Sequence, residues 1–185
     1  IEKLIISLKM WYNKNIQWRC MFLFKKGDMI VYPNQGIGVI DLIEEKEFKG
    51  DMKTFYKFHL LNNSLKLMMP VNKVESSNIR LISDMNSLDS ALEKFKKTKL
   101  DEETLINSNC KERIEYNSSK IKSGTLEDYL EVYLKLSYIR KQHSLNSSEN
   151  QMFNKAKKIL IEEISAVKNI SKNDAEQMLV SITKH

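Results

Sequence analysis

The chain offers little material for catalysis or for a metal site. Its two cysteines, Cys20 and Cys110, lie far apart, and its three histidines are scattered: His59, His143 and His185. A structural zinc site needs four closely arranged ligands, usually cysteine and histidine, so none is expected here. Two cysteines also cannot form a disulfide framework, which favours a reducing cytosol. We expect no metal, no cofactor and no enzymatic activity.

Two further patterns with chemical potential have simpler explanations. Gly36-Ile37-Gly38 lacks both the third glycine of a dinucleotide loop and the Gly-Lys-Ser/Thr of a phosphate loop. The acidic pairs Glu102-Glu103 and Glu162-Glu163 are adjacent in sequence, and adjacent residues on a helix do not face each other. Neither pattern indicates an active site.

Lysine is the abundant charged residue. The chain carries 30 Lys+Arg against 24 Asp+Glu, a net charge of +6, and 26 of the basic residues are lysine. Half of the excess lies in residues 1–20, whereas residues 83–185 carry only +1. Because lysine meets phosphate as a point charge while arginine reads guanine with a bidentate fork, any DNA binding should have weak sequence specificity.

The predicted secondary structure changes from strands to helices near residue 82. A length of 185 residues allows one large domain or two small ones. Five β-prone segments with alternating or branched apolar residues are separated by turns: 30–32, 37–43, 56–60, 65–69 and 79–82. Their roughly ten-residue spacing predicts a small, strongly bent barrel.

From Ser83 onward the apolar spacing is that of helices. Apolar faces run through 88–95, 110–121, 125–142, 147–167 and 171–182. The expected capping residues are Ser108, Thr125 with Asp128, Ser147 or Ser148, and Ser171 with Asp174. We predict an α+β fold in two domains: a five-stranded β-barrel over residues 21–82, a linker over 83–86 and an all-helical domain of about five helices over 87–185.

Residues 1–20 fit neither domain. Their apolar run is too short for a signal peptide, no small-residue cleavage site follows it, and Met21 directly precedes the patterned segment. We expect an N-terminal extension, either a non-native segment or a short amphipathic helix that docks through Trp11, Tyr12 and Trp18. No apolar run approaches the length of about 18 residues that a membrane span requires.

The most distinctive segment is FKKGDMIVYPNQGIGVI, residues 24–40. Gly27-Asp28 forms an entry turn, the apolar run is a strand, and Gly36 and Gly38 permit a tight return. This segment resembles the CarD family of bacterial transcription regulators and the polymerase-interacting module of transcription-repair coupling factors. The Lys49-Gly50 turn, the Met69-Pro70 strand end and the helical segment 145–160 extend the resemblance to about residues 22–180.

The resemblance implies a Tudor- or SH3-like barrel that docks on the β subunit of RNA polymerase. It also implies a helical domain that rests on promoter DNA at the upstream edge of the transcription bubble and stabilises the open complex. The partners are therefore expected to be the polymerase β subunit and promoter DNA, in the cytoplasm and without a membrane. No catalysis and no cofactor are implied.

Carried over residue by residue, the resemblance places polymerase contacts at Lys46, Phe48, Lys49 and Met68. The family usually has arginine at the first and last of these places, so a bidentate fork is replaced by a point charge and by apolar contact. Without the resemblance, the two lysines would be read as a solvated hairpin and Met68 as a partly covered strand residue.

DNA contacts are expected from Cys110, Lys111, Arg113, Lys155, Lys157 and Lys158. Many family members place a tryptophan wedge where this chain has Cys110, whose spacing with Ile114 and Ile121 favours a core position instead. The lysines of 155–158 could reach phosphates or simply form a solvated helix face. The leading hypothesis is a transcription regulator with both contacts, and the alternative is a polymerase-docking module without productive DNA contact.

Overall fold

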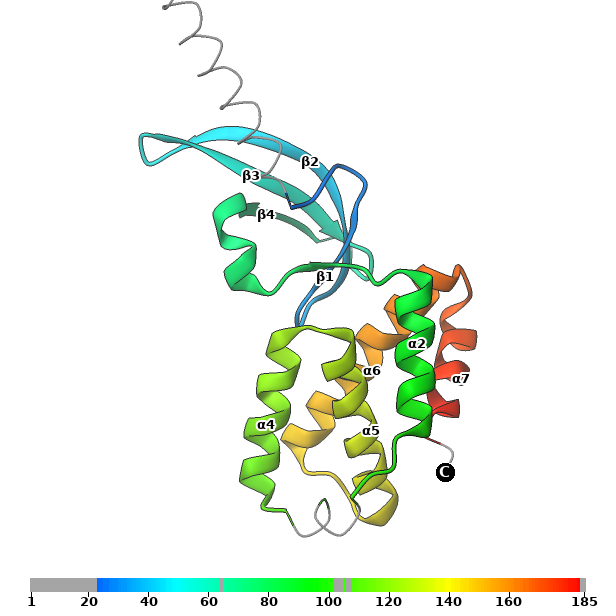
Figure 1. The fold of residues 1–185 in the computed structure, drawn as a ribbon. Helices are drawn as coiled ribbons and strands as arrows, with labels where there is room; N and C mark the ends of the chain where they lie inside the picture. Colours follow the sequence, from blue (N-terminus) through cyan, green and yellow to red (C-terminus); the bar gives the residue numbers. More distant parts are fainter. Residues whose placement is uncertain (1–22, 64, 102–104, 106–107, 184–185) are drawn as a thin grey trace, which may run out of the picture.

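A computed structural model describes residues 23–63, 65–101, 105 and 108–183. Strands come first in the chain and helices follow, so the predicted two-part α+β organisation is confirmed (Figure 1). The extension predicted for residues 1–20 lies outside the described residues. Within the described part, no helix combines the length and apolar character needed to cross a membrane.

Five antiparallel strands form one open sheet in the order β4-β3-β2-β1-β5. They are β1 (Met29–Tyr32), β2 (Gly36–Phe48), β3 (Asp51–Leu60), β4 (Lys66–Pro70) and β5 (Arg80–Leu81). Each coincides with a predicted strand, but the predicted closure into a barrel is not observed. In the described residues β4 and β5 stay at opposite edges, because β5 is only two residues long and pairs only with β1. Two short 3-10 helices, η1 (Val71–Lys73) and η2 (Glu75–Ser77), take up the chain between them.

One face of the sheet forms a small apolar core. Its buried side chains come from three strands, β1, β2 and β3, and from the flanking segments: Phe24, Ile30, Ile40, Tyr56, Phe58, Leu60, Val74 and Ile79. A β-bulge between Ile40 and Leu42 shifts the pairing of β2 with β3. Because the extra residue reverses the alternation, Leu42 leaves the core face and is 37% exposed. The bulge thus decides which residues of the long hairpin face outward.

Five helices follow the sheet in the described residues, as predicted: α2 (Met85–Lys97), α4 (Cys110–Ser123), α5 (Leu126–Gln142), α6 (Ser147–Lys168) and α7 (Lys172–Ser181). Thr125 and Ser171 are the N-caps of α5 and α7, as predicted. The caps predicted for α4 (Ser108) and α6 (Ser147 or Ser148) are wrong by one or two residues. Asn109 caps α4 and Asn146 caps α6, because each asparagine carbonyl accepts a backbone N–H of the first turn.

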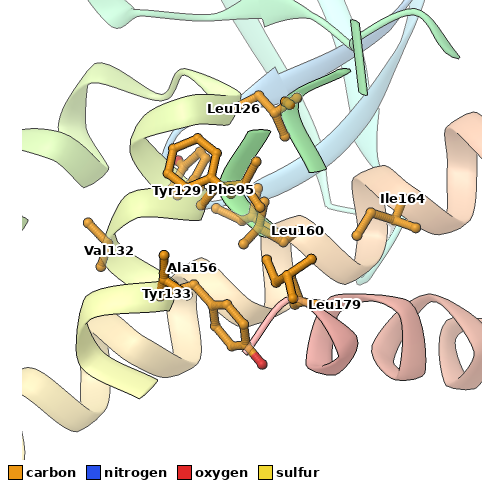
Figure 2. Close-up of a cluster of buried hydrophobic side chains, with 14 of the residues drawn as sticks. Phe95, Leu126, Tyr129, Val132, Tyr133, Ala156, Leu160, Ile164 and Leu179 are labelled. Carbon is orange, nitrogen blue, oxygen red and sulfur yellow. The ribbon is translucent and has the colours of Figure 1, made fainter. Parts of the chain in front are cut away.

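The helices pack around one larger core (Figure 2). Tyr129 and Val132 of α5 and Leu160 of α6 are fully or almost fully buried, and the ring of Tyr133 stacks on Phe153 at 5.3 Å. Val31 and Ile37 of the sheet belong to the same cluster. The helical core therefore continues into the base of the sheet instead of ending at the domain boundary.

Polar contacts fasten the sheet to α6 at this boundary. The guanidinium of Arg80 in β5 donates to both carboxylate oxygens of Glu163, at 2.7 and 2.8 Å. Ser83 donates to the same carboxylate through its backbone N–H and its hydroxyl, and Arg80 also donates to the carbonyl of Gly124. The neighbouring Glu162 accepts from the backbone N–H of Ile37 at 3.4 Å.

The two glutamates point to different partners, as adjacent helix residues must. Yet both are buried, and the side chain of Glu163 has no exposed surface. Glu163 is compensated by its ion pair with Arg80, and Glu162 accepts a hydrogen bond from the sheet, so both residues belong to the polar part of the domain junction.

Candidate interaction surfaces

The residues predicted to contact polymerase gather on one side of the sheet. Lys46 and Phe48 share a face of β2 because successive strand residues alternate between faces, and Lys53 of β3 lies directly opposite Lys46. Met68 of β4 lies opposite Lys57, which shares the face of Lys53. We call this surface the outer face and define it by six residues: Leu42, Lys46, Phe48, Lys53, Lys57 and Met68.

Phe48 is an exposed aromatic side chain near the tip of the hairpin. It is 49% exposed, and its ring meets the edge of Phe55 at a centroid distance of 6.3 Å. The ammonium groups of Lys49 and Lys53 lie 5.7 and 5.3 Å from the centre of the same ring. The exposed ring of Phe48 therefore makes cation–π contacts with two lysines.

Lys49 itself occupies the turn between β2 and β3, as the resemblance implied. Lys49 and Gly50 both have positive φ, 57° and 82°. This is the conformation that matches the twist of a two-residue hairpin, and glycine adopts it without strain.

Three residues of the outer face escaped sequence reasoning: Leu42, Lys53 and Lys57. Lys57 pairs with Glu44 at 2.7 Å, and Met68 is 43% exposed beside it. The alternation of β3 places Lys53 and Lys57 on one face, but only the cross-strand register shows that this face also carries Phe48. The bulge that turns Leu42 outward has no signal in the sequence.

The start of α4 is the place where the resemblance puts a DNA wedge. Cys110 is the first residue of this helix and is exposed, so the preferred prediction of a core position is wrong. The buried face of α4 begins later and consists of Asn117 and Ile121. The amide of Asn146 lies 2.8 Å from the Cys110 sulfur, and Lys111 is exposed next to it.

Arg113 points into the helical domain. Its guanidinium donates to Glu149 at 2.8 and 3.0 Å and to the carbonyl of Ser108 at 2.5 Å, and its side chain is only 12% exposed. Glu149 also accepts from the backbone N–H of Asn146 in the capping box of α6. Arg113 therefore joins the start of α4 to the start of α6.

The lysines of α6 divide between two sides of the helix. Lys155 lines a hollow of about 330 Å³ between α4 and α6, with Lys122 among the residues of the hollow. Lys157 pairs with Glu176 of α7 at 2.5 Å, and Lys158 lines a second hollow on that side. The structure thus separates Lys155 from the other two.

On α4, the hollow is lined by Ile114, Ser118 and Lys122 at helical spacing, and Lys111 extends this stripe by one turn toward the start of the helix. The opposite side of the hollow is formed by a stripe on α6 that consists of Ser148, Gln151 and Lys155. The two stripes define what we call the α4–α6 groove, a polar surface with a lysine at each end of its α4 stripe and one on α6. Lys122 was not singled out by the sequence.

A separate charge network joins α4 to α5. The ammonium of Lys120 lies 2.7 Å from Asp128 and 3.1 Å from Glu131. Burial raises the pKa of both carboxyls, but hydrogen bonds outweigh this effect. The pKa of Asp128 is held below its ordinary value of 3.8 by bonds from Lys120, Ser123 and Thr125. The pKa of Glu131 is held below its ordinary value of 4.5 by bonds from Lys135, Tyr116 and Lys120. The same contacts raise the pKa of Lys120.

We expect Lys120→Met to destabilise the protein at neutral pH by about 1 kcal/mol, because the network is partly exposed. Carboxyls with lowered pKa values stabilise the fold above their ordinary pKa values, and this stabilisation is lost as the pH falls through the folded values. The difference between variant and wild type should therefore shrink below a pH of about 4. Urea unfolding of both proteins at several pH values measures this difference in unfolding free energy. A difference that grows in acid would contradict a stabilising role for the pairs of Lys120 with Asp128 and Glu131.

Comparisons with known proteins agree with both parts of the structure. Residues 24–83 match the family model of the CarD-like/TRCF RID domain, and residues 92–180 match that of the CarD C-terminal domain. The chain is also 35% identical over 149 residues to the putative transcription factor YdeB of Bacillus subtilis (strain 168), covering 80% of this chain and 95% of that protein. The two family models cover the sheet and most of the helices, and the relative covers most of the chain. The chain therefore belongs to the CarD family of transcription regulators.

Proposed function

We propose that this regulator binds the β subunit of RNA polymerase through the outer face of its sheet. The helical domain would then contact upstream promoter DNA and stabilise the open complex in the cytoplasm. The observation that carries the proposal is the convergence of Lys46, Phe48 and Met68 on one exposed face of a domain of the CarD-like/TRCF RID type.

The chemistry of the outer face supports a protein partner. Exposed Phe48 and Met68 offer apolar anchors, and Lys46 and Lys53 lie on the same face. An aromatic anchor within a polar rim is the usual energetic centre of a protein interface. The complementary surface on polymerase should be an apolar pocket bordered by acidic residues.

Phe48→Ala should weaken binding to the isolated polymerase β subunit by about 1–2 kcal/mol, or about tenfold in Kd, because an exposed anchor is lost. Met52→Ala is the matched control. Met52 is 66% exposed on the same hairpin but lies opposite Glu47, on the other face. Equal losses in the two variants, measured by calorimetry, would show that the outer face is not the binding surface.

For the DNA half of the proposal, the α4–α6 groove is the better candidate. Lys111 and Lys155 are exposed in or beside it, whereas Arg113 is engaged by Glu149 and Lys157 by Glu176. The stripes of α4 and α6 present serine, glutamine and lysine, which suit phosphate contacts and carry no base specificity. We therefore assign weakly specific backbone contact to Lys111, Lys122 and Lys155.

Each phosphate contact releases counterions, so affinity for a forked promoter duplex should fall with salt. Replacing Lys111, Lys122 and Lys155 together with alanine should reduce the slope of log K against log salt by about three. Lys172→Ala, an exposed lysine at the start of α7, should leave the slope unchanged.

The second candidate function is a polymerase-docking module without productive DNA contact. It is favoured by Cys110 at the place of the family tryptophan and by the internal pairing of Arg113. A wild-type slope near zero supports this alternative and contradicts the DNA half of the proposal.

A further inference from the structure

The helices α2 and α5 both end on the side of the helical domain that is remote from the sheet (Figure 1). The residues around these two helix ends line a basic cleft. Its volume is about 680 Å³. Four lysines line it, Lys96, Lys97, Lys99 and Lys141, against a single acidic residue, Glu93, among the described residues that form its wall. Neither the outer face nor the α4–α6 groove includes any of these residues.

Among the described lining residues, Glu93 does not balance the charges of Lys97, Lys99 and Lys141. Glu93 and Lys97 approach each other only to 3.7 Å, and both side chains are more than half exposed, so this pair is weak. Lys99 is exposed, and Lys141 donates to the carbonyl of Thr183 at 2.5 Å, which leaves its charge unneutralised. Lys97, Lys99 and Lys141 against Glu93 thus leave a net positive charge of about two among the described lining residues, in a concave site where the field is focused.

Lysines often gather at helix C-termini simply to complement the helix dipole. Here some of the terminal carbonyls already have other donors. At the end of α2, Thr98 donates through its hydroxyl to the carbonyl of Lys94 and through its backbone N–H to the carbonyl of Phe95. At the end of α5, the backbone N–H of His143 donates to the carbonyl of Ile139. The helix ends therefore do not account for the whole cluster.

The floor of the cleft is apolar. Leu134 and Ile182 are buried beneath it, and Leu100 and Tyr138 border it. A floor of this kind beneath several lysines fits a ligand with a flat or apolar part and several negative charges. Phosphate esters of nucleosides have this chemistry, and lysine suits phosphate because it needs no fixed geometry.

We propose that this cleft binds a phosphate ester, with phosphates on Lys97, Lys99 and Lys141 and the apolar part against Leu100 and Tyr138. The phosphates belong either to a free nucleotide or to a nucleic-acid backbone. The proposal is independent of polymerase docking, and its residues are separate from those of the α4–α6 groove.

The test titrates the full chain with a fluorescent ATP analogue, with inorganic triphosphate as competitor, and separately with a short DNA duplex. The variant is Lys97→Glu with Lys99→Glu, two exposed positions whose change should not disturb folding. The matched control is Lys25→Glu with Lys26→Glu, an equal change in charge at exposed positions of the sheet domain.

For a free nucleotide, we expect saturable binding that triphosphate displaces, about tenfold weaker in the Lys97/Lys99 variant and within about twofold of wild type in the control. For a nucleic-acid backbone, only the duplex binds, and the variant lowers its salt slope by about two. Equal effects of variant and control overturn the proposal. So does displacement of the nucleotide by polyglutamate as readily as by triphosphate, because the cleft would then prefer an acidic peptide.

Discussion

Arg80→Met should lower the free energy of unfolding by about 3–5 kcal/mol, one of the two largest effects we expect from a single substitution in this chain. The variant leaves the Glu163 carboxylate without its guanidinium partner at a position with no exposed surface. Ser83 can supply two hydrogen bonds but no charge. The burial of an unpaired charge, and not the loss of one contact, makes the expected effect large.

Urea unfolding followed by circular dichroism measures this effect. The control is Arg140→Met, since the guanidinium of Arg140 is exposed and lies 5.2 Å from the ring of Phe153. Such a contact should contribute less than about 1 kcal/mol. In addition, Glu163→Met in the Arg80→Met background should recover part of the loss, because two apolar side chains leave no buried charge. A loss in Arg80→Met no larger than in the control would refute this account of the junction.

The junction also limits how the two proposed contacts can be arranged. Val31 and Ile37 of the sheet share the core of the helices, and Arg80 in β5 is bonded to α6 and to Gly124 before α5. The outer face and the α4–α6 groove are thus carried by two domains that are packed and bonded together. If both proposed contacts exist, a variant with a weakened junction should keep the proposed polymerase binding and lose the proposed stabilisation of the open complex.

The sequence predicted the elements well because their signals are local. Strands of alternating or branched apolar residues and helices with a repeating apolar face were all found at the expected places, and Thr125 and Ser171 acted as the expected caps. The openness of the sheet was missed, since closure depends on whether β4 reaches β5 across the chain, which no local pattern encodes.

Long-range pairing explains the other differences. Glu163 and Glu149 look like solvated helix residues in sequence, but arginines 83 and 36 residues away make them buried partners.

Cys110 shows the opposite error. Its spacing with Ile121 is that of a buried face, yet α4 starts at Cys110 itself, and a side chain at the helix end is not covered by the packing of later turns.

The second large effect concerns Arg113, which the resemblance assigns to DNA. Arg113→Met should destabilise the helical domain by about 3–5 kcal/mol, because Glu149 is 2% exposed and would lose its charged partner. The variant would also lose the link that Arg113 makes between Ser108, before α4, and Glu149 in the capping box of α6. Chemical unfolding of the full chain measures the loss, with Lys111→Met as the control for an exposed cation two residues away.

The DNA affinity of an Arg113 variant depends on the stability of α4 as well as on any phosphate contact. If Arg113→Met unfolds α4, its loss of DNA affinity reports stability and not a phosphate contact. Combining it with Glu149→Gln removes the uncompensated charge while the amide can still serve the capping box, so stability should partly return. A double variant that regains stability but binds the duplex with an unchanged salt slope places Arg113 outside the DNA contact. A slope lowered by about one in that stable background would instead show that the guanidinium reaches a phosphate.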